Sequence, residues 1–366
     1  MDLVVVGAGI AGITVAAEFA RSRSVVLLEA DTGPAQQTTG RSAATYVKAY
    51  GGPAIQPFNE VGREWLASGG GGRLDRSLLS PRGLVVIATP GTDGAFDHFV
   101  ADGARRIDAA EAVARFPAIR PDQVADAMYD PDVLDIDAAG AVAAARQSFR
   151  ESGGELRVSS RVTGLRRGRG AWQVTTELGE LEAGAVVNAA GAWSDALAAM
   201  AGLPRIGMQP LRRTICTFPA PAGLRHEQWP MLLEASERFY LKPESGQFLA
   251  SPADETPSDP GDPRPEMLDV ATAIDRVQTA TTLVAETVTS AWAGLRTFAP
   301  DRSLVLGPDP LERSFIWCAG HGGFGIQAAH PAARAVVALT DRGALPDDLL
   351  AAGARPTAVM PDRFRG

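Results

Sequence analysis

The chain has 366 residues, of which 45% are hydrophobic and 21% charged, and its formal net charge is −8. The length suffices for about two domains of ordinary size, and the composition is that of a globular protein. The acidic balance argues against a surface for nucleic acid or anionic lipid, because such surfaces need clustered Lys and Arg. We therefore expect a small-molecule partner.

Cysteines, histidines and apolar runs restrict the function further. Cys216 and Cys318 lie far apart and outside any C-x-x-C pattern, which predicts neither a disulfide framework nor a cysteine-rich metal site. No apolar run reaches the roughly 20 residues that span a bilayer, and the first apolar strand starts at residue 2, which leaves no room for a leader peptide. We expect a cytoplasmic protein, and no metal held by His98, His226, His321 or His330.

The first 30 residues carry a dinucleotide-binding pattern. Two apolar runs, residues 2–6 and 25–28, are typical of strands buried in a parallel sheet. Between them Gly7, Gly9 and Gly12 have the spacing G-x-G-x-x-G and open a helix. Gly7 permits the tight turn, Gly9 lets the backbone approach a pyrophosphate, and Gly12 lets helix and strand pack closely. The helix N-terminus would attract the phosphates.

An acidic residue completes this pattern. Glu29 ends the second strand, 20 residues after Gly9, where a carboxylate accepts hydrogen bonds from the ribose of a bound dinucleotide. The pattern alone fits NAD as well as FAD. The hydroxyl-rich, small-residue segment Thr38–Ala44 favours FAD, because it suits a long cofactor and interrupts the regular βαβ repeat of a nicotinamide enzyme.

The middle of the chain does not continue the βα alternation. A helix is predicted from Ala138 to Arg150, followed by a glycine stop at Gly153 and Gly154. Residues 186–193 form a strand that runs into a small-residue turn, a second place where the backbone can approach a cofactor. Strands are predicted at residues 84–88, 155–159, 171–176, 180–187, 206–218 and 239–241.

The last third is predicted to contain a helix at 268–282, strands near 292–297, 303–306 and 315–319, a glycine turn at 320–325 and a helix at 326–340. The final strand, turn and helix would direct another helix N-terminus to the cofactor. We predict an α/β fold, α+β overall, in which a Rossmann-like FAD-binding domain carries an inserted β-rich substrate domain. The FAD-binding domain is expected to be discontinuous, at 1–50, 135–205 and 295–366, with the substrate domain at 51–134 and 206–294.

Motifs along nearly the whole chain resemble the D-amino-acid oxidase superfamily of flavoproteins, which includes glycine and sarcosine oxidases. Within it they are most similar to bacterial D-arginine dehydrogenases. The motifs lie at 7–12, 39–44 with 49–51, 130–131 with 135–137, 187–193, 209–210 with 212–214, 229–231, 239–243, 292–296 and 322–327.

The resemblance implies roles at the substrate. Arg213 and Arg296 would bind the substrate carboxylate, assisted by the Tyr50 hydroxyl; guanidinium groups suit this role because they stay charged and bind carboxylates bidentately. Tyr240 would flank the substrate, and the Gly323 carbonyl would accept a hydrogen bond from its amine. The alternative for either arginine alone is a structural ion pair, and for Tyr240 a place in the core.

The resemblance also implies FAD, which we expect to be noncovalent because neither cysteine stands at an evident attachment position. Beyond the three glycines of the first turn and Glu29, its expected contacts are Ile10, Ala11, Ala30, Thr39, Gly40, Arg41, Ser42, Ala43, Val162, Ala190, Gly191, Trp193, Arg296, Gly322, Gly323, Gly325, Ile326 and Gln327.

Three positions depart from the D-arginine dehydrogenase pattern and define the expected side-chain pocket. Leu84 replaces the acidic residue that receives a cationic side chain, and Thr45 and Val47 replace a histidine and a threonine. Because a buried cation without its carboxylate is strongly disfavoured, we predict a preference for neutral D-amino acids over D-arginine and D-lysine. Lys48 would favour an acidic side chain if it pointed inward; the alternative is a solvated lysine.

The expected reaction is oxidative deamination of D-amino acids by hydride transfer to flavin N5, with hydrolysis of the imino acid to a 2-oxo acid and ammonia. Positioning would supply most of the catalysis, and the redox chemistry belongs to the cofactor. The alternatives are an oxidase of glycine, sarcosine, another secondary amine or a 2-hydroxy acid, a nicotinamide-dependent dehydrogenase, and a non-catalytic flavoprotein subunit. The electron acceptor (oxygen, quinone or dye) stays open. His321 would either tune the flavin or serve the structure alone.

Overall fold

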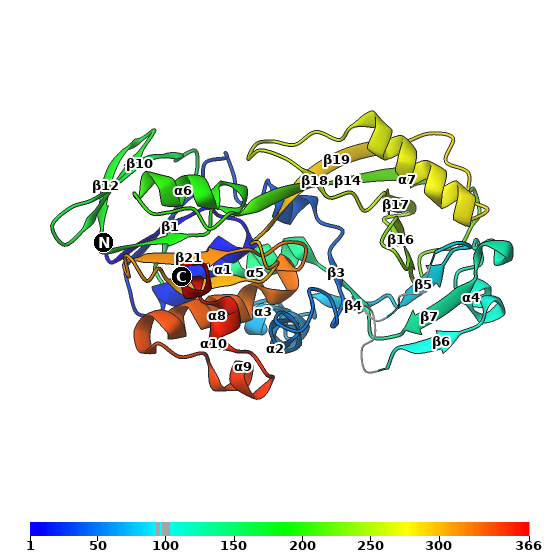
Figure 1. Cartoon of the computed structure of the whole chain (residues 1–366), viewed down its shortest axis with the longest axis horizontal. Coiled ribbons are helices and arrows are strands. Elements are labelled where there is room, and N and C mark those ends of the chain that lie inside the picture. The colour runs from blue at the N-terminus through cyan, green and yellow to red at the C-terminus, as the bar shows by residue number, and fades with distance from the viewer. Residues whose placement is uncertain (93–95, 97–102, 366) are drawn as a thin grey trace.

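A computed structural model of the chain describes residues 1–92, 96 and 103–365, so His98 lies outside the described residues. Figure 1 shows two parts side by side, and both chain termini lie in the part built around the parallel strands. No helix in the described ranges is long and apolar enough to cross a membrane.

A six-stranded sheet forms the first part. Its order is β20-β21-β13-β1-β2-β9, and all neighbours are parallel except β20 and β21. β-Branched and other apolar residues make up most of its central strands, which are buried on both faces, as the sequence pattern predicts. The strand bounds are β1 Leu3–Val6, β2 Val25–Leu28, β9 Glu155–Arg157, β13 Ala185–Asn188, β20 Val305–Pro308 and β21 Phe315–Ala319.

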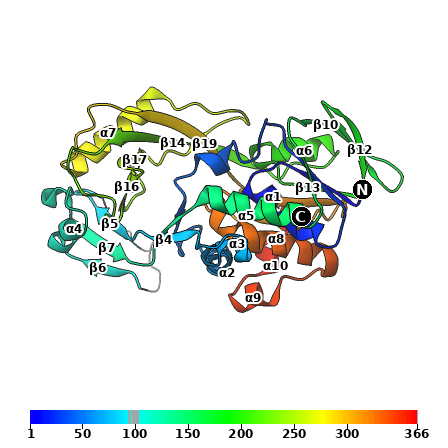
Figure 2. The ribbon, with the colours of Figure 1, turned by 180° about the vertical axis from the view of Figure 1, so that it is seen from behind.

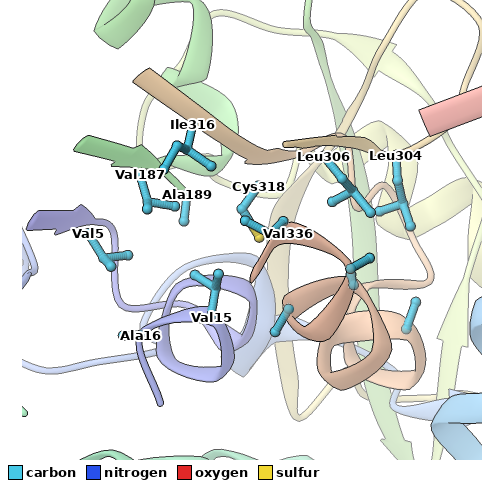
Figure 3. Close-up of a cluster of buried hydrophobic side chains, with 14 of the residues drawn as sticks. Val5, Val15, Ala16, Val187, Ala189, Leu304, Leu306, Ile316, Cys318 and Val336 are labelled. Carbon is cyan, nitrogen blue, oxygen red and sulfur yellow. The ribbon is translucent and has the colours of Figure 1, made fainter. Parts of the chain in front are cut away.

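Helices cover one face of this sheet: α1 (Ile10–Ala20), α5 (Ala138–Glu151) and α8 (Gly325–Arg342) (Figures 1 and 2). Figure 3 shows Val5 and Val187 of the sheet packing toward α1 and α8. Because successive strand residues point to opposite faces, neighbouring side chains such as Val4 pack on the other side. There they contact β10 (Val162–Arg167), β11 (Trp172–Thr176), β12 (Gly179–Ala183) and α6 (Ser194–Met200).

A nine-stranded, mainly antiparallel sheet forms the second part. Its order is β18-β14-β17-β16-β15-β5-β7-β6, and β19 pairs with β14. Helices α7 (Met267–Ala280) and α4 (Ala109–Arg115) pack on one face, and the opposite face carries Leu84 and Ile215. The strand bounds are β5 Leu84–Ala88, β6 Arg105–Ile107, β7 Asp126–Asp130, β14 Gln209–Pro219, β15 Met231–Glu234, β16 Tyr240–Glu244, β17 Gln247–Ser251, β18 Thr256–Pro257 and β19 Ser290–Phe298.

Short elements complete the fold. A small antiparallel sheet of β3 (Thr45–Tyr46), β8 (Leu134–Ile136) and β4 (Leu79–Pro81) lies between the two parts. Helix α2 (Gln56–Ala67) packs against α8. The remaining helices and turns are η1 Thr38–Arg41, α3 Gly69–Gly72, η3 Pro121–Gln123, η4 Gly191–Trp193, α9 Asp347–Ala351, α10 Pro356–Val359 and η5 Pro361–Phe364.

The predicted fold class is confirmed, since a parallel Rossmann-like sheet accompanies an antiparallel, β-rich sheet. The prediction of one strand at 180–187 is wrong. Gly184 divides it: β12 ends before it in an antiparallel sheet, and β13 begins after it in the parallel sheet. A Cβ on Gly184 would lie 3.0 Å from the Asp2 carbonyl oxygen, so the chain changes sheets where it passes the N-terminus. The domain boundaries stay a prediction.

Candidate active site and cofactor cavity

A cavity of about 530 Å³ lies where the carboxyl ends of β1, β13 and β21 meet strands β14 and β19. Ligands of open α/β sheets bind at the carboxyl ends of the strands, and the volume is typical of small-molecule sites. Of the expected cofactor contacts, those that line the cavity are Gly7, Gly9, Ile10, Ala11, Glu29, Ala30, Thr39, Arg41, Ser42, Ala43, Val162, Ala190, Gly191, Trp193, Arg296, Gly322, Gly323, Gly325, Ile326 and Gln327.

Two glycines of that expectation, Gly12 and Gly40, do not line the cavity but permit close backbone packing. A Cβ on Gly12 would lie 1.8 Å from the Gly7 carbonyl oxygen, and one on Gly40 would lie 2.4 Å from that of Ala35. Gly7 itself has φ +99°, a left-handed conformation that favours glycine. At Gly9 a Cβ would meet the Thr39 hydroxyl at 3.3 Å and, apart from its chain neighbours, no other atom of the described residues within 4 Å, so the first turn presents open backbone to the cavity.

Glu29 lines the cavity directly after β2, and its role toward a ribose stays a prediction. Its Oε2 accepts a hydrogen bond from Ala8 N at 2.7 Å, and its Oε1 accepts one from Asp31 N at 3.0 Å. A carboxylate has about four acceptor positions, so oxygen lone pairs remain for ribose hydroxyls. Burial raises the pKa of Glu29, while the backbone hydrogen bonds from Asp31 and Ala8 oppose this increase.

The segment Thr38–Arg41 is fixed between the first helix and β19. Ile10 N donates to the Thr39 hydroxyl at 3.1 Å, and the Thr38 hydroxyl donates to the Leu295 carbonyl at 2.7 Å. Arg41 donates to the Ala293 carbonyl at 3.0 Å. The hydroxyl-rich segment therefore forms a wall of the cavity instead of an exposed loop.

Arg213 and Arg296 lie on one face of the β14–β19 ladder. Arg213 pairs with Gly294 and Arg296 with Leu211, so the two arginines are diagonal neighbours two residues apart in register. Diagonal neighbours on one face lie within reach of long side chains. Both line the cavity, and Arg296 Nη1 donates to the Tyr50 hydroxyl at 3.1 Å.

The two guanidinium groups differ in their partners. Arg213 is buried; its Nε donates to the Asp254 carbonyl at 2.7 Å, and its Nη2 lies 3.4 Å from Glu255 Oε1. Burial, together with the positive charge of Arg296, lowers the pKa of Arg213. Within the part of the chain that the structure describes, Arg296 forms no ion pair with any carboxylate. Because an unpaired charge in a partly closed site is unfavourable, the arrangement favours an anionic ligand.

Gly323 and Tyr240 lie near this pair. A Cβ on Gly323 would lie 2.5 Å from the Tyr50 hydroxyl and 3.0 Å from Arg296 Cζ, so a larger residue would have to displace the ends of these side chains. Neither Tyr50 nor Tyr240 lines the cavity; burial acts to lower the pKa of Arg296, and the electrostatic influence of both tyrosines raises it, with a raised pKa as the net result. The Tyr240 hydroxyl is buried and has no hydrogen-bond partner among the described residues.

Of the three residues predicted to form the side-chain pocket, one lines the cavity and two do not. Thr45 lines the cavity, whereas Val47 and Leu84 lie behind it, in an apolar cluster with the cavity-lining Ile215. Gln327 fixes the Val47 backbone with two 3.1 Å hydrogen bonds, accepting from Val47 N and donating to Val47 O. Lys48 does not line this cavity; its Nζ lies 3.6 Å from Glu60 Oε2 in a separate surface groove.

His321 and Cys318 line the cavity at the turn between β21 and α8. Burial lowers the pKa of His321 to about 4, so its ring is neutral at physiological pH, and its Nε2 has no hydrogen-bond partner among the described residues. Burial raises the pKa of Cys318 to about 12, which keeps it a thiol of low reactivity. In residues 1–92, 96 and 103–365, no three His, Cys, Asp or Glu side chains lie together as metal ligands.

Several cavity and near-cavity residues were missed by the sequence analysis. Ile215 and Asp262 line the cavity, and Glu255 contacts Arg213 from outside it. Ile215 has a sequence signal, since it is two residues after Arg213 on the same strand face. Glu255 and Asp262 lie in irregular segments between β17 and α7, where no periodic pattern indicates which side chains turn inward.

The chain belongs to the FAD-dependent oxidoreductase (DAO) family, whose family model matches residues 2–339. Its cofactor is FAD. The residues fit that group: open backbone at Gly9 and the helix N-terminus behind it suit phosphates, Glu29 suits a ribose, and the cavity continues to the two arginines.

The chain is similar to known proteins of this kind. It is 25% identical to glycine oxidase of Geobacillus kaustophilus over 337 residues, 87% of each chain. It is 31% identical to mitochondrial dimethylglycine dehydrogenase of Rattus norvegicus over 140 residues, 37% of this chain but 16% of that protein's length. The structure of L-proline dehydrogenase from P. horikoshii has a TM-score of 0.84 at 20% identity, covering 100% of this chain and 97% of that one. The narrower likeness to D-arginine dehydrogenases stays a prediction.

Proposed function

We propose that the protein is an FAD-dependent oxidase or dehydrogenase of amino acids, which binds the substrate carboxylate between Arg213 and Arg296. The observation that carries this proposal is the state of Arg296: a guanidinium without a carboxylate partner among the described residues, facing a cavity beside a second arginine. A fixed guanidinium fork matches a carboxylate in geometry and charge. Membership of the family and the match to glycine oxidase support the same reaction class.

The chain's own residues bind and orient the substrate in this proposal. Arg213 and Arg296 hold the carboxylate, and the Tyr50 hydroxyl, whose oxygen accepts from Arg296, donates a further hydrogen bond to that carboxylate. The Gly323 carbonyl accepts from the substrate amine, which fixes the Cα–H bond relative to the cofactor side of the cavity. FAD, when bound, would accept the hydride from Cα, and with it both electrons. The imine product then adds water and releases ammonia, leaving a 2-oxo acid.

The proposed substrate has the D configuration and a neutral side chain. The apolar cluster that includes Leu84, Val47 and Ile215 lies beside the cavity, and Lys48 lies elsewhere. A cationic side chain placed against that cluster would lose its hydration without gaining a carboxylate. We therefore infer weak activity on D-arginine and D-lysine.

A second candidate is oxidation of glycine or of a secondary amine that carries a carboxylate. The names of the matched relatives, glycine oxidase and dimethylglycine dehydrogenase, favour it. The same pair of arginines would bind these substrates, because they share the carboxylate and differ only in the substituents at Cα and nitrogen.

A substrate panel under two detection schemes tests both candidates. The rate of cofactor reduction is measured without oxygen for D- and L-leucine, D-methionine, D-phenylalanine, D-arginine, glycine, sarcosine and a 2-hydroxy acid. The proposal predicts the highest kcat/KM for a neutral D-amino acid; a clear preference for D-arginine, L-leucine or the 2-hydroxy acid contradicts it. A preference for glycine or sarcosine supports the second candidate. Oxygen consumption beside dye reduction then separates oxidase from dehydrogenase.

A further inference from the structure

We propose that Arg302 keeps the carboxylate of Glu255 from competing with the substrate for Arg213. The inference rests on the proposed function, because it takes Arg213 as a guanidinium that binds the substrate carboxylate. Arg302 does not line the cavity. It is therefore a positioning residue, which acts on the substrate only through Glu255 and Arg213.

The backbone that carries Glu255 is tied to the strand of Arg213. Thr214 N donates to Asp254 Oδ1 at 2.7 Å, and the Thr214 hydroxyl donates to Asp254 Oδ2 at 3.0 Å. Arg213 Nε donates to the Asp254 carbonyl at 2.7 Å. Because the residue before Glu255 is fixed in this way, the Glu255 carboxylate stays within reach of Arg213 whatever the cavity contains.

Two arginines contact the Glu255 carboxylate, one with two hydrogen bonds and the other with a single long one. Arg302 binds it with both terminal nitrogens, Nη1 to Oε2 at 3.1 Å and Nη2 to Oε1 at 2.8 Å. Arg213 makes one contact, from Nη2 to the same Oε1 at 3.4 Å, which is long for a hydrogen bond. The bidentate pair with Arg302 therefore holds Glu255 back from closer contact with Arg213.

Arg213 can donate hydrogen bonds to a ligand only while Glu255 stays paired with Arg302. Among the described residues no hydrogen bond engages its Nη1, while Nε and Nη2 already have partners. A Glu255 released from Arg302 would pair more closely with Arg213, the nearest remaining cation in contact with it. A substrate carboxylate would then have to displace an internal carboxylate of the same charge, which weakens its binding.

The position of Arg302 does not depend on Glu255 alone. Its Cζ lies 3.8 Å from the centre of the Phe298 ring, a cation–π contact. Its backbone has φ +59°, a left-handed conformation that asparagine tolerates better than most residues. Its side chain is 52% exposed, and exposed ion pairs contribute little to folding stability. A substitution of Arg302 by asparagine is therefore expected to fold.

Three variants test the inference: Arg302→Asn, Glu255→Gln and the double variant. Arg302→Asn is expected to raise KM about five- to tenfold, the size of one ordinary hydrogen bond, because the substrate then has to displace Glu255 from Arg213, with kcat unchanged within about twofold. Glu255→Gln is expected to leave KM at or below the wild-type value, and the double variant to match Glu255→Gln. Arg334→Asn, which removes another bidentate pair (2.6 and 3.0 Å to Asp348) whose residues do not line the cavity, is the matched control with unchanged KM.

Binding of benzoate, an unreactive monocarboxylate, to the FAD-loaded protein is measured in parallel by calorimetry. Its Kd should rise in Arg302→Asn and recover in the double variant. An unchanged KM and Kd in Arg302→Asn overturns the inference, and so does an equal increase in the double variant, which would assign the effect to the Phe298 contact. If the Kd of benzoate rises in Arg302→Asn and recovers in the double variant, but no amino acid or amine is turned over, the proposed function is wrong and the inference about Arg302 holds. If substrates are turned over but the Kd of benzoate does not change in this way, the proposed function holds and the inference about Arg302 is wrong.

Discussion

Arg296 and Tyr50, 246 residues apart in the chain, share a 3.1 Å hydrogen bond between guanidinium Nη1 and the phenol oxygen. Tyr50 follows the small sheet between the two parts of the molecule, and Arg296 lies on β19. Gly323 packs against both side chains, and a methyl group there would displace the Tyr50 hydroxyl or the Arg296 guanidinium. This contact fixes the orientation of the guanidinium that we propose for the substrate carboxylate.

Replacing Tyr50 with phenylalanine removes this hydrogen bond and keeps the ring. We expect KM for a neutral D-amino acid to rise about two- to tenfold, which corresponds to the usual net contribution of one hydrogen bond, with FAD content unchanged. Tyr46→Phe is the matched control, because it also removes a hydroxyl hydrogen bond, but one to the Asn59 carbonyl at 3.1 Å instead of one to Arg296. Equal effects of the two substitutions on KM would contradict a role for Tyr50 at the substrate.

A side chain at Gly12, which follows the first glycine turn, is expected to clash strongly with the backbone. In Gly12→Ala the new Cβ would lie 1.8 Å from the Gly7 carbonyl oxygen, which is backbone and cannot move away cheaply. Overpacking of this kind typically destabilises by about 1–3 kcal/mol or more, so we expect a lower Tm and less bound FAD. Gly164→Ala, whose Cβ would meet Thr175 atoms at an ordinary 3.6 Å, is the control. The measurements are thermal unfolding and flavin absorbance per protein; identical values for both variants count against the packing role of Gly12.

His321 predicts a specific pH dependence of stability. Burial lowers the pKa of His321 from its ordinary 6.5 to about 4. Between these values the unfolded chain binds a proton that the folded chain does not, so stability falls as the pH decreases from about 6.5 to 4, by up to about 3 kcal/mol from this group. Above pH 6.5 the group contributes no pH dependence. We expect Tm of the wild type to fall more steeply than that of His321→Asn across this window; parallel curves would show that the histidine is not held neutral.

The sequence alone predicts the parts of the site that depend on local pattern. The glycine spacing with Glu29 after the second strand located the cofactor turn, because strand, turn and helix are consecutive in the chain. The segment Thr38–Ala44, predicted to contact the cofactor, lines the cavity apart from Gly40, which packs against the Ala35 carbonyl oxygen. That Arg213 and Arg296 share one strand face depends on the register of β14 and β19, which the motifs do not specify.

Features that depend on contacts between distant segments could not be predicted from sequence patterns. Glu255 and Arg302 are 47 residues apart in irregular segments, so no periodicity brings them together. The run 180–187 was predicted as one strand, but Gly184, which lies beside the Asp2 carbonyl oxygen, separates β12 from β13. Leu84 and Val47 were expected as pocket walls, yet they lie one layer behind the cavity.

The most direct test of the central claim compares two reductants that differ only in the carboxylate. D-Leucine and 3-methylbutylamine have the same side chain and amine, but the second has no anionic group for Arg213 and Arg296. Bleaching of the FAD absorbance is followed after mixing each with the loaded protein in the absence of oxygen. We predict rapid bleaching by D-leucine and, at the same concentration, a rate at least about 100-fold lower with the amine, because a lost charged contact costs about 3 kcal/mol or more. Equal rates with the two compounds would contradict carboxylate binding by the arginine pair.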